Sequence, residues 1–147
     1  MKYDDASWHY GGDFPSDLPL EAGATHIAMF LGWAVLNGLA GPYHTIDSAN
    51  ELGRLQRREV TPGEWFIRAC DEKFTDDDLN DEGNSFAQAY YGDSEGLRTD
   101  PGSYFVDYCE AFRSAPSAYH VEDSWVSFDA LAPTLASRFE RWRSHRA

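Results

Sequence analysis

The sequence has little positive charge and few cysteines. It carries 12 Lys and Arg against 25 Asp and Glu, which gives a net charge of −13. Proteins that bind nucleic acid or anionic lipid use Lys and Arg to contact phosphates, so this balance argues against both kinds of partner. The two cysteines, Cys70 and Cys109, have no CxxC spacing. We expect them to be reduced thiols packed as small hydrophobic side chains.

Long hydrophobic runs are also missing. The longest apolar stretch, residues 24–40, is interrupted by a histidine, two glycines and an asparagine. It falls short of the ~20 residues that a membrane-spanning helix needs. At the N-terminus, acids follow Lys2 directly, with no apolar segment typical of a secretory signal. We therefore expect a cytoplasmic protein that has no membrane partner.

The familiar signatures of catalysis and metal binding are absent. The sequence contains no HExxH, GxSxG, P-loop or GxGxxG pattern. Asp76, Asp78 and Asn80 match the first three ligand positions of an EF-hand loop, but Asp81 stands where the loop requires Gly, and Ala87 where it requires Glu. The patterns accordingly predict no metal, no cofactor and no catalytic residue.

Hydrophobic patterning, in contrast, is strong. Aromatic residues make up 15% of the 147 residues, too many for a disordered chain, and the length suits one domain. Apolar residues recur at three- and four-residue steps and show no sustained period of two, which predicts a mostly α, single compact domain over residues 1–147. We expect about six or seven helices, near residues 23–39, 47–58, 62–70, 81–91, 103–112 and 125–142. The first is apolar on nearly every face, as a central helix would be.

Helix boundaries have local signals. Thr61-Pro62-Gly63-Glu64 forms a capping box with proline at the first helical position, and Thr75 to Asp78 repeats the box. Asn80 is expected to cap the helix that follows. Residues 118–121 are expected to be briefly extended, and Pro133 to kink or break the last helix.

Residues 1–19 combine aromatics, acids, glycine and proline, and we expect an ordered, extended arm that packs on the helical domain. One interpretation is that an acid near its start caps a short turn and that the histidines pack in the core. The other is a polar cluster that holds a metal ion or small substrate for an enzyme. The residues of that alternative cluster are Asp4, Asp5, His9, Asp13 and His26.

The acids gather at one helix junction. Residues 71–82 hold seven acids against the single cation of Lys73. Acids favour helix N-termini, which is one explanation of the cluster. The other is a docking face for a basic protein, with aromatic side chains as anchors. The residues predicted to bind that partner are Asp71, Glu72, Asp76, Asp77, Asp78, Asp81, Glu82, Trp8 and Tyr10.

Four segments carry a resemblance to a known group: residues 2–15 (KYDDASWHYGGDFP), 22–26, 70–74 and 82–91. Together they resemble an uncharacterised family of small acidic bacterial proteins, which brings no assigned activity. In size and charge such proteins are similar in kind to immunity proteins of bacterial toxin systems, by analogy rather than by motif. We therefore predict an acidic immunity-type inhibitor that occludes a basic toxin. The alternatives are the enzyme described above and an interaction module unrelated to toxins.

Overall fold

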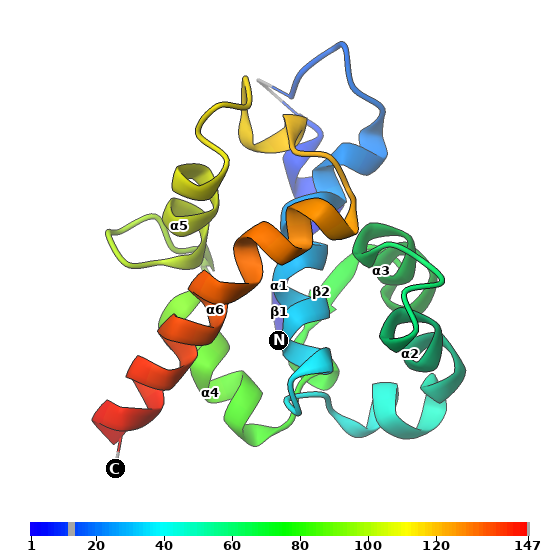
Figure 1. Ribbon diagram of the computed structural model, residues 1–147, viewed down its shortest axis with the longest axis vertical. Helices are drawn as coiled ribbons and strands as arrows, with labels where there is room; N and C mark the ends of the chain where they lie inside the picture. The colour runs from blue at the N-terminus through cyan, green and yellow to red at the C-terminus, as the bar shows by residue number, and fades with distance from the viewer. Residues whose placement is uncertain (12–13, 147) are drawn as a thin grey trace.

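Helix α1 (Thr25–Leu36) lies at the centre of the fold (Figure 1). The computed structural model describes residues 1–11 and 14–146, and within it every residue from Thr25 to Val35 is buried. This confirms that the apolar residues on nearly every face of this segment mark a central helix. The other helices pack around it, and α3 and α6 both contact α1 directly.

The mostly α class and the single compact domain predicted from the sequence are confirmed. The remaining α-helices are α2 (Ala49–Gln56), α3 (Pro62–Cys70), α4 (Asp81–Tyr90), α5 (Tyr104–Ala111) and α6 (Trp125–Arg146). The short helices are η1 (Ala6–His9), η2 (Leu20–Ala24), η4 (Asp76–Asp78) and η5 (Ala118–His120), all 3-10, and the π-helix η3 (Tyr43–Asp47). Among the described helices, none has both the length and the apolar character of a bilayer-spanning segment.

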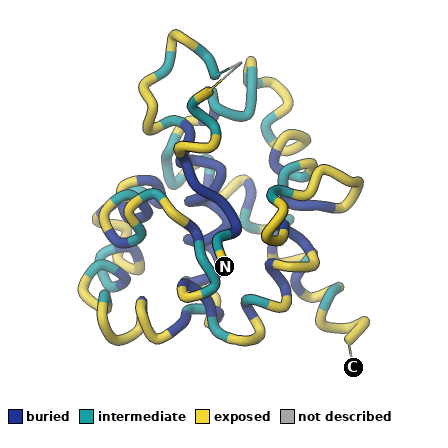
Figure 2. Tube along the Cα trace, turned by 180° about the vertical axis from the view of Figure 1, so that it is seen from behind, coloured by how far each residue is buried: buried dark blue, intermediate teal, exposed yellow. Residues whose placement is uncertain are grey.

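The N-terminal arm is ordered in its described part, and it begins as a strand. β1 (Lys2–Asp5) pairs antiparallel with β2 (Lys73–Thr75), with a register shift between Lys2 and Asp4. Tyr3 is completely buried. Seen from behind, the buried segment runs upward from the N-terminus through the middle of the molecule (Figure 2). A second small sheet joins β3 (Gly92–Asp93) to β4 (Gly96–Leu97).

Aromatic rings fill the core around Phe30, which lies midway along α1. Six other rings have their centroids 5.0–6.5 Å from that of Phe30. Ring pairs at these separations add to the free energy gained from burial. These rings come from α1 itself, β2, α4, α5 and the residue after α4, so one side chain connects five segments. They are Trp33, Phe74, Phe86, Tyr90, Tyr91 and Tyr104.

The predicted helix starts are confirmed where their signals are local. Thr61 accepts from the backbone N–H of Glu64, whose carboxylate accepts from the backbone N–H of Thr61. Asn80 accepts from the N–H of Gly83 and caps α4. The second capping box also forms, between Thr75 and Asp78, but it opens a single 3-10 turn.

One expectation about the C-terminal third is wrong, and a second, that Pro133 kinks or breaks the last helix, is wrong as to the break. Residues 118–121 are not an extended segment: Ala118–His120 form η5, because the hydroxyl of Ser117 accepts from the N–H of Tyr119 and starts a turn. Helix α6 continues through Pro133 without a break. Cys109 also differs from expectation, since it is exposed rather than packed inside.

Candidate functional site

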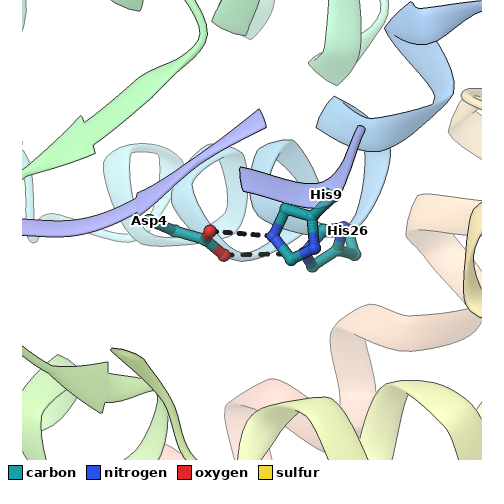
Figure 3. Close-up of side chains that lie close together, drawn as sticks. All are labelled: Asp4, His9 and His26. Carbon is teal, nitrogen blue, oxygen red and sulfur yellow. Dashed lines mark hydrogen bonds and ion pairs between the residues drawn. The ribbon is translucent and has the colours of Figure 1, made fainter. Parts of the chain in front are cut away.

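Asp4, His9 and His26 meet inside the protein, where β1, η1 and the first turn of α1 come together (Figure 3). Nε2 of His9 lies 2.8 Å from Oδ1 of Asp4. Nε2 of His26 lies 3.5 Å from Oδ2 of the same carboxylate. The two imidazole rings are edge to face, with centroids 4.4 Å apart. Three of the five residues predicted for a polar cluster are therefore direct neighbours.

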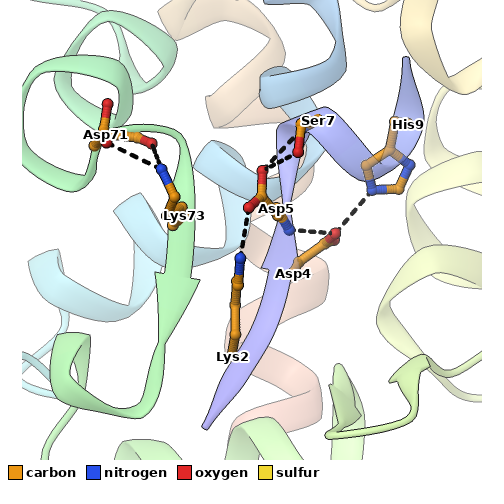
Figure 4. Close-up of polar contacts among 7 residues, drawn as sticks. All are labelled: Lys2, Asp4, Asp5, Ser7, His9, Asp71 and Lys73. Atoms are coloured by element: carbon orange, nitrogen blue, oxygen red, sulfur yellow. Dashed lines mark hydrogen bonds and ion pairs between the residues drawn. The ribbon is translucent and has the colours of Figure 1, made fainter. Parts of the chain in front are cut away.

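Asp5 is not part of this cluster, which corrects the prediction. Its carboxylate accepts from the ammonium of Lys2 at 2.7 Å and from the hydroxyl of Ser7 at 2.7 Å (Figure 4). It also accepts from the N–H of Ser7 and so caps η1, which turns the chain and brings His9 toward Asp4. Asp13, the remaining predicted member, lies outside the described residues.

Two tyrosines support the cluster. The hydroxyl of Tyr91 donates to Oδ2 of Asp4 at 2.6 Å, and the hydroxyl of Tyr119 lies 2.9 Å from Nδ1 of His9. The backbone N–H of Asp5 donates to Oδ1 of Asp4 at 2.8 Å. Both carboxylate oxygens of Asp4 are thus held in place. Sequence reasoning missed both tyrosines, which are distant in the chain and have no local signal.

His26 is the exception in this network. It is completely buried, and neither of its ring nitrogens has a hydrogen-bond partner among the described residues. Around it lie the rings of Phe105, Tyr108 and Tyr119, with centroids 5.8–6.2 Å away. A buried polar group without a partner costs about 1–3 kcal/mol. Such a group within a cluster of ligand-type side chains marks a site where an interaction is missing.

The charges of the cluster follow from burial and from its internal contacts. Burial alone would raise the pKa of Asp4, but the contacts with His26 and His9 outweigh it and hold this pKa below its usual range. Burial lowers the pKa of His26, although Asp4 opposes the shift. At neutral pH the cluster therefore contains an ionised carboxylate beside a neutral imidazole, which has one nitrogen lone pair free to accept a proton or bind a cation.

The predicted acidic docking face loses one member. Asp78 is buried, with Oδ1 2.7 Å from Nε2 of His44 and Oδ2 accepting from the N–H of Thr75 at 2.8 Å. The thiol of Cys70 lies 3.7 Å from the same histidine nitrogen. Asp78 is therefore not available at the surface, because it closes its own capping box and pairs with a histidine of η3.

Several other junction acids have partners within the protein. Asp76 binds the N-terminal ammonium group of Met1 at 2.9 Å, and Asp71 binds Lys73 at 3.0 Å (Figure 4). Glu72 accepts from the hydroxyl of the half-buried Tyr10. Two of these acids are thus paired with a cation of the protein, and the third is hydrogen-bonded to a neutral hydroxyl.

The rest of the predicted docking residues stay at the surface. Asp77 and Asp81 are exposed and form no ion pair with the described residues. Glu82 is exposed and 3.8 Å from Arg143. Trp8 is 52% exposed, with the ammonium of Lys2 5.2 Å from its ring centroid. These residues keep the position that a docking face requires.

A cavity of about 380 Å³ lies between η2, α3 and residues 119–123. Its walls are largely apolar, and four carboxylates stand around them. No Lys or Arg is among its lining residues. Tyr119 is one of the lining residues, and its hydroxyl contacts His9, so this residue is shared by the cavity and the cluster. The cavity is formed by Leu18, Pro19, Glu21, Ala22, Thr25, Gly63, Glu64, Ile67, Tyr119, His120, Val121, Glu122 and Asp123.

Comparison with protein families places the chain among relatives. Residues 2–121 match the family model described as "Domain of unknown function (DUF7832)". The chain belongs to this family. The resemblance to an uncharacterised family is confirmed in that respect, and the DUF7832 family carries no activity that could be transferred to this member. No curated protein and no solved structure matches the chain.

Proposed function

We propose that this DUF7832 protein binds a basic protein partner and, by occluding it, acts as an immunity-type inhibitor of a bacterial toxin. The cavity is the observation that carries this proposal, because it combines apolar walls with carboxylates and has no Lys or Arg among its lining residues. A Lys or Arg side chain suits such a site. Its aliphatic stem packs on apolar surface while its charged head pairs with a carboxylate.

Two of the four cavity carboxylates are available to a partner. Asp123 accepts from the hydroxyl of Thr61 at 2.5 Å and from the N–H of Gly63 at 2.8 Å, and Glu64 is held in the capping box. Glu21 and Glu122 are exposed and pair with no cation among the described residues. We assign these two the role of receiving the partner's cation.

The net charge of −13 supports the same proposal at longer range. A field of this sign accelerates the encounter with a basic protein and disfavours acidic competitors. The exposed junction acids Asp77 and Asp81 contribute to it, and Trp8 offers the kind of aromatic side chain that often dominates a binding surface. In this proposal the junction attracts the partner and the cavity holds it.

The test uses the product of the open reading frame adjacent to this gene as the probe. The full chain is co-expressed with that product, and growth rescue and the dissociation constant are measured. The double variant Glu21→Lys with Glu122→Lys is expected to weaken binding by at least tenfold and to abolish rescue. Unchanged toxicity in the presence of the wild-type chain, with no complex formed, would end the proposal.

A matched control distinguishes the role of the cavity carboxylates from that of the junction acids. The double variant Asp77→Lys with Asp81→Lys makes the same change in net charge at two exposed junction acids. We expect it to slow association and flatten the salt dependence while leaving the dissociation rate unchanged. Faster dissociation in this variant, and not in the cavity variant, would show that the partner is held by the junction acids and not by the cavity.

The enzyme alternative has less support. Asp4 and His26 are buried, and none of the cluster's three residues lines the cavity described above. His9, in contrast, is only partly buried.

A further inference from the structure

We propose that Asp4, His9 and His26 bind a divalent transition-metal ion. Each residue offers one ligand atom, and the three atoms lie within 4.8 Å of one another. Two imidazoles and one carboxylate form the ligand set that proteins use for Zn²⁺ and for non-haem Fe²⁺. The three side chains come from β1, η1 and α1, so the site would be assembled only in the folded protein.

His26 supplies an independent observation. Both of its nitrogens lack a hydrogen-bond partner among the described residues, although the side chain is completely buried. Its Nε2 faces the carboxylate of Asp4 at 3.5 Å (Figure 3), which is too long for a good hydrogen bond. An ion bound at this nitrogen would provide the missing interaction.

Two of the three proposed ligands, His9 and Asp4, have the supporting hydrogen bonds that are usual around a metal ion, whereas Nδ1 of His26 has none among the described residues. A ligating histidine usually has its second ring nitrogen hydrogen-bonded, which fixes the tautomer and the orientation of the ring. Nδ1 of His9 lies 2.9 Å from the hydroxyl of Tyr119, which leaves Nε2 directed at the cluster. Tyr91 holds Asp4 in the same way through Oδ2.

The distances fit an ion after a small movement. With metal–ligand bonds of about 2.0–2.2 Å, two ligands of a tetrahedral zinc ion lie about 3.4 Å apart. The separation of 3.5 Å between Nε2 of His26 and Oδ2 of Asp4 is close to this value. Nε2 of His9 lies 2.8 Å from the other oxygen, Oδ1, which is a hydrogen-bond distance, so this separation must open by roughly half an ångström and the carboxylate must turn to present one oxygen to both imidazoles. His9, at the end of a short 3-10 turn, is the side chain best placed to move.

A second cluster, formed by His44, Cys70 and Asp78, serves as an internal comparison. Its ligand atoms also lie within 4.8 Å of one another. Here, however, Nε2 of His44 has a hydrogen-bond partner in Asp78 at 2.7 Å, and the other oxygen of Asp78 caps η4. The ring nitrogen that faces this cluster is therefore satisfied without an ion, and we assign the second cluster a structural role.

Zn²⁺ is the probe for the experiment. The full-length protein is treated with a chelator and titrated with Zn²⁺ against a chromophoric competitor. We expect one equivalent to bind, and Tm to rise by roughly 8 °C at a free concentration one hundred times the Kd. His9→Gln should weaken binding at least 100-fold, and Tyr119→Phe by about 10–100-fold. His44→Gln and the surface variant His145→Gln should bind as the wild type does.

Cobalt identifies the ligands without any substitution, in case a variant fails to fold. Co²⁺ bound by Asp4, His9 and His26 should give visible ligand-field bands and no thiolate charge-transfer band. A charge-transfer band would place the ion at Cys70 and overturn the proposal, as would full-affinity binding by His9→Gln or the absence of Zn²⁺ binding by the wild type. None of these measurements involves a protein partner, so failure here is distinguishable from failure of the proposed function.

Discussion

The hydroxyl of Tyr119 lies 2.9 Å from Nδ1 of His9, although 110 positions separate the two residues in the sequence. The contact joins the buried cluster to the cavity, since Tyr119 is also a lining residue. Tyr91 supports the same cluster from another side and donates to the carboxylate of Asp4. The two phenols therefore bind partners of different charge, an imidazole and an ionised carboxylate.

Because the two partners differ in charge, removing the two hydroxyls should lower the free energy of unfolding by different amounts. Tyr91→Phe takes a donor from a buried carboxylate and should lower the free energy of unfolding by about 1.5–3 kcal/mol, whereas Tyr119→Phe should cost about 0.5–1.5 kcal/mol. Urea denaturation with chelator present measures both. Equal costs, or the reverse order, would show that Asp4 is not the charged centre of this network.

Gly41 has no space for a side chain. A Cβ at this position would lie 2.8 Å from the carbonyl oxygen of Leu79 and 2.9 Å from that of Asp77. Both atoms belong to the backbone, and the N–H of Gly41 donates to the carbonyl of Asp78 at 3.1 Å, so the two segments are held close together. Gly41→Ala is expected to destabilise the protein by about 1–3 kcal/mol.

Gly32 provides the matched control for that substitution. It lies within α1, and its Cβ would meet only Cβ of Pro62, at an ordinary contact distance of 3.6 Å. Gly32→Ala should therefore stabilise the protein by roughly 0.5–1 kcal/mol, because alanine loses less conformational entropy in a helix. Thermal and urea unfolding of the two variants should give changes of opposite sign, and the same sign for both would contradict the close approach at Gly41.

Local signals explain which parts of the fold could be predicted. The capping box from Thr61 to Glu64 places donor and acceptor within four residues, and it opens the expected helix. The same box at Thr75 opens a single turn, because Leu79 then pairs with Ala40 and the N–H of Asn80 donates to Leu39. Those partners are about 40 residues away, and no pattern near Thr75 indicates them.

The site was predictable in composition but not in detail. The density of Asp and His near the N-terminus indicates a polar cluster, but it does not indicate which of the neighbouring acids takes part. In the strand β1, the neighbouring side chains of Asp4 and Asp5 point to opposite faces, so Asp4 reaches His9 and Asp5 does not. The register shift between Lys2 and Asp4 interrupts the alternation and allows Lys2 to reach Asp5. The prediction that Asp78 binds a partner is wrong, and the sequence alone indicates why. A residue that closes a capping box is not free to bind a partner.

The two cysteines should differ in reactivity. Burial raises the pKa of the Cys70 thiol well above its ordinary value, and the carboxylate of Asp78 raises it further. Burial also raises the pKa of Cys109, but this residue is exposed. Because the thiolate is the nucleophile, iodoacetamide at pH 8 should alkylate Cys109 first, and the rate at Cys70 should continue to rise at higher pH.

Peptide mapping by mass spectrometry identifies the modified thiol. Cys109→Ser should leave a protein that reacts slowly, and Asp78→Asn should accelerate the reaction at Cys70, because the substitution removes a negative charge near the thiolate. Faster alkylation of Cys70 than of Cys109 in the wild type would contradict the described burial.

Asp107 connects three helices through its carboxylate. Its Oδ2 accepts from Nε of Arg138 at 2.8 Å and from the hydroxyl of Tyr90 at 2.6 Å, while Oδ1 accepts from Nη2 of Arg138 at 3.0 Å. The three residues come from α5, α6 and α4. Only 12% of the Asp107 side chain is exposed, so solvent screens these contacts weakly. Asp107→Asn keeps the shape and removes the charge, and it should cost about 1.5–3 kcal/mol.

Asp129→Asn is the appropriate comparison for Asp107→Asn. Asp129 also forms a two-bond contact with an arginine, at 2.8 and 2.9 Å to Arg58, but both side chains are about half exposed. Exposed ion pairs contribute little and are screened by salt, so this variant should unfold almost as the wild type does. Equal losses of stability in the two variants, at low and at high salt, would show that burial does not strengthen the contacts of Asp107.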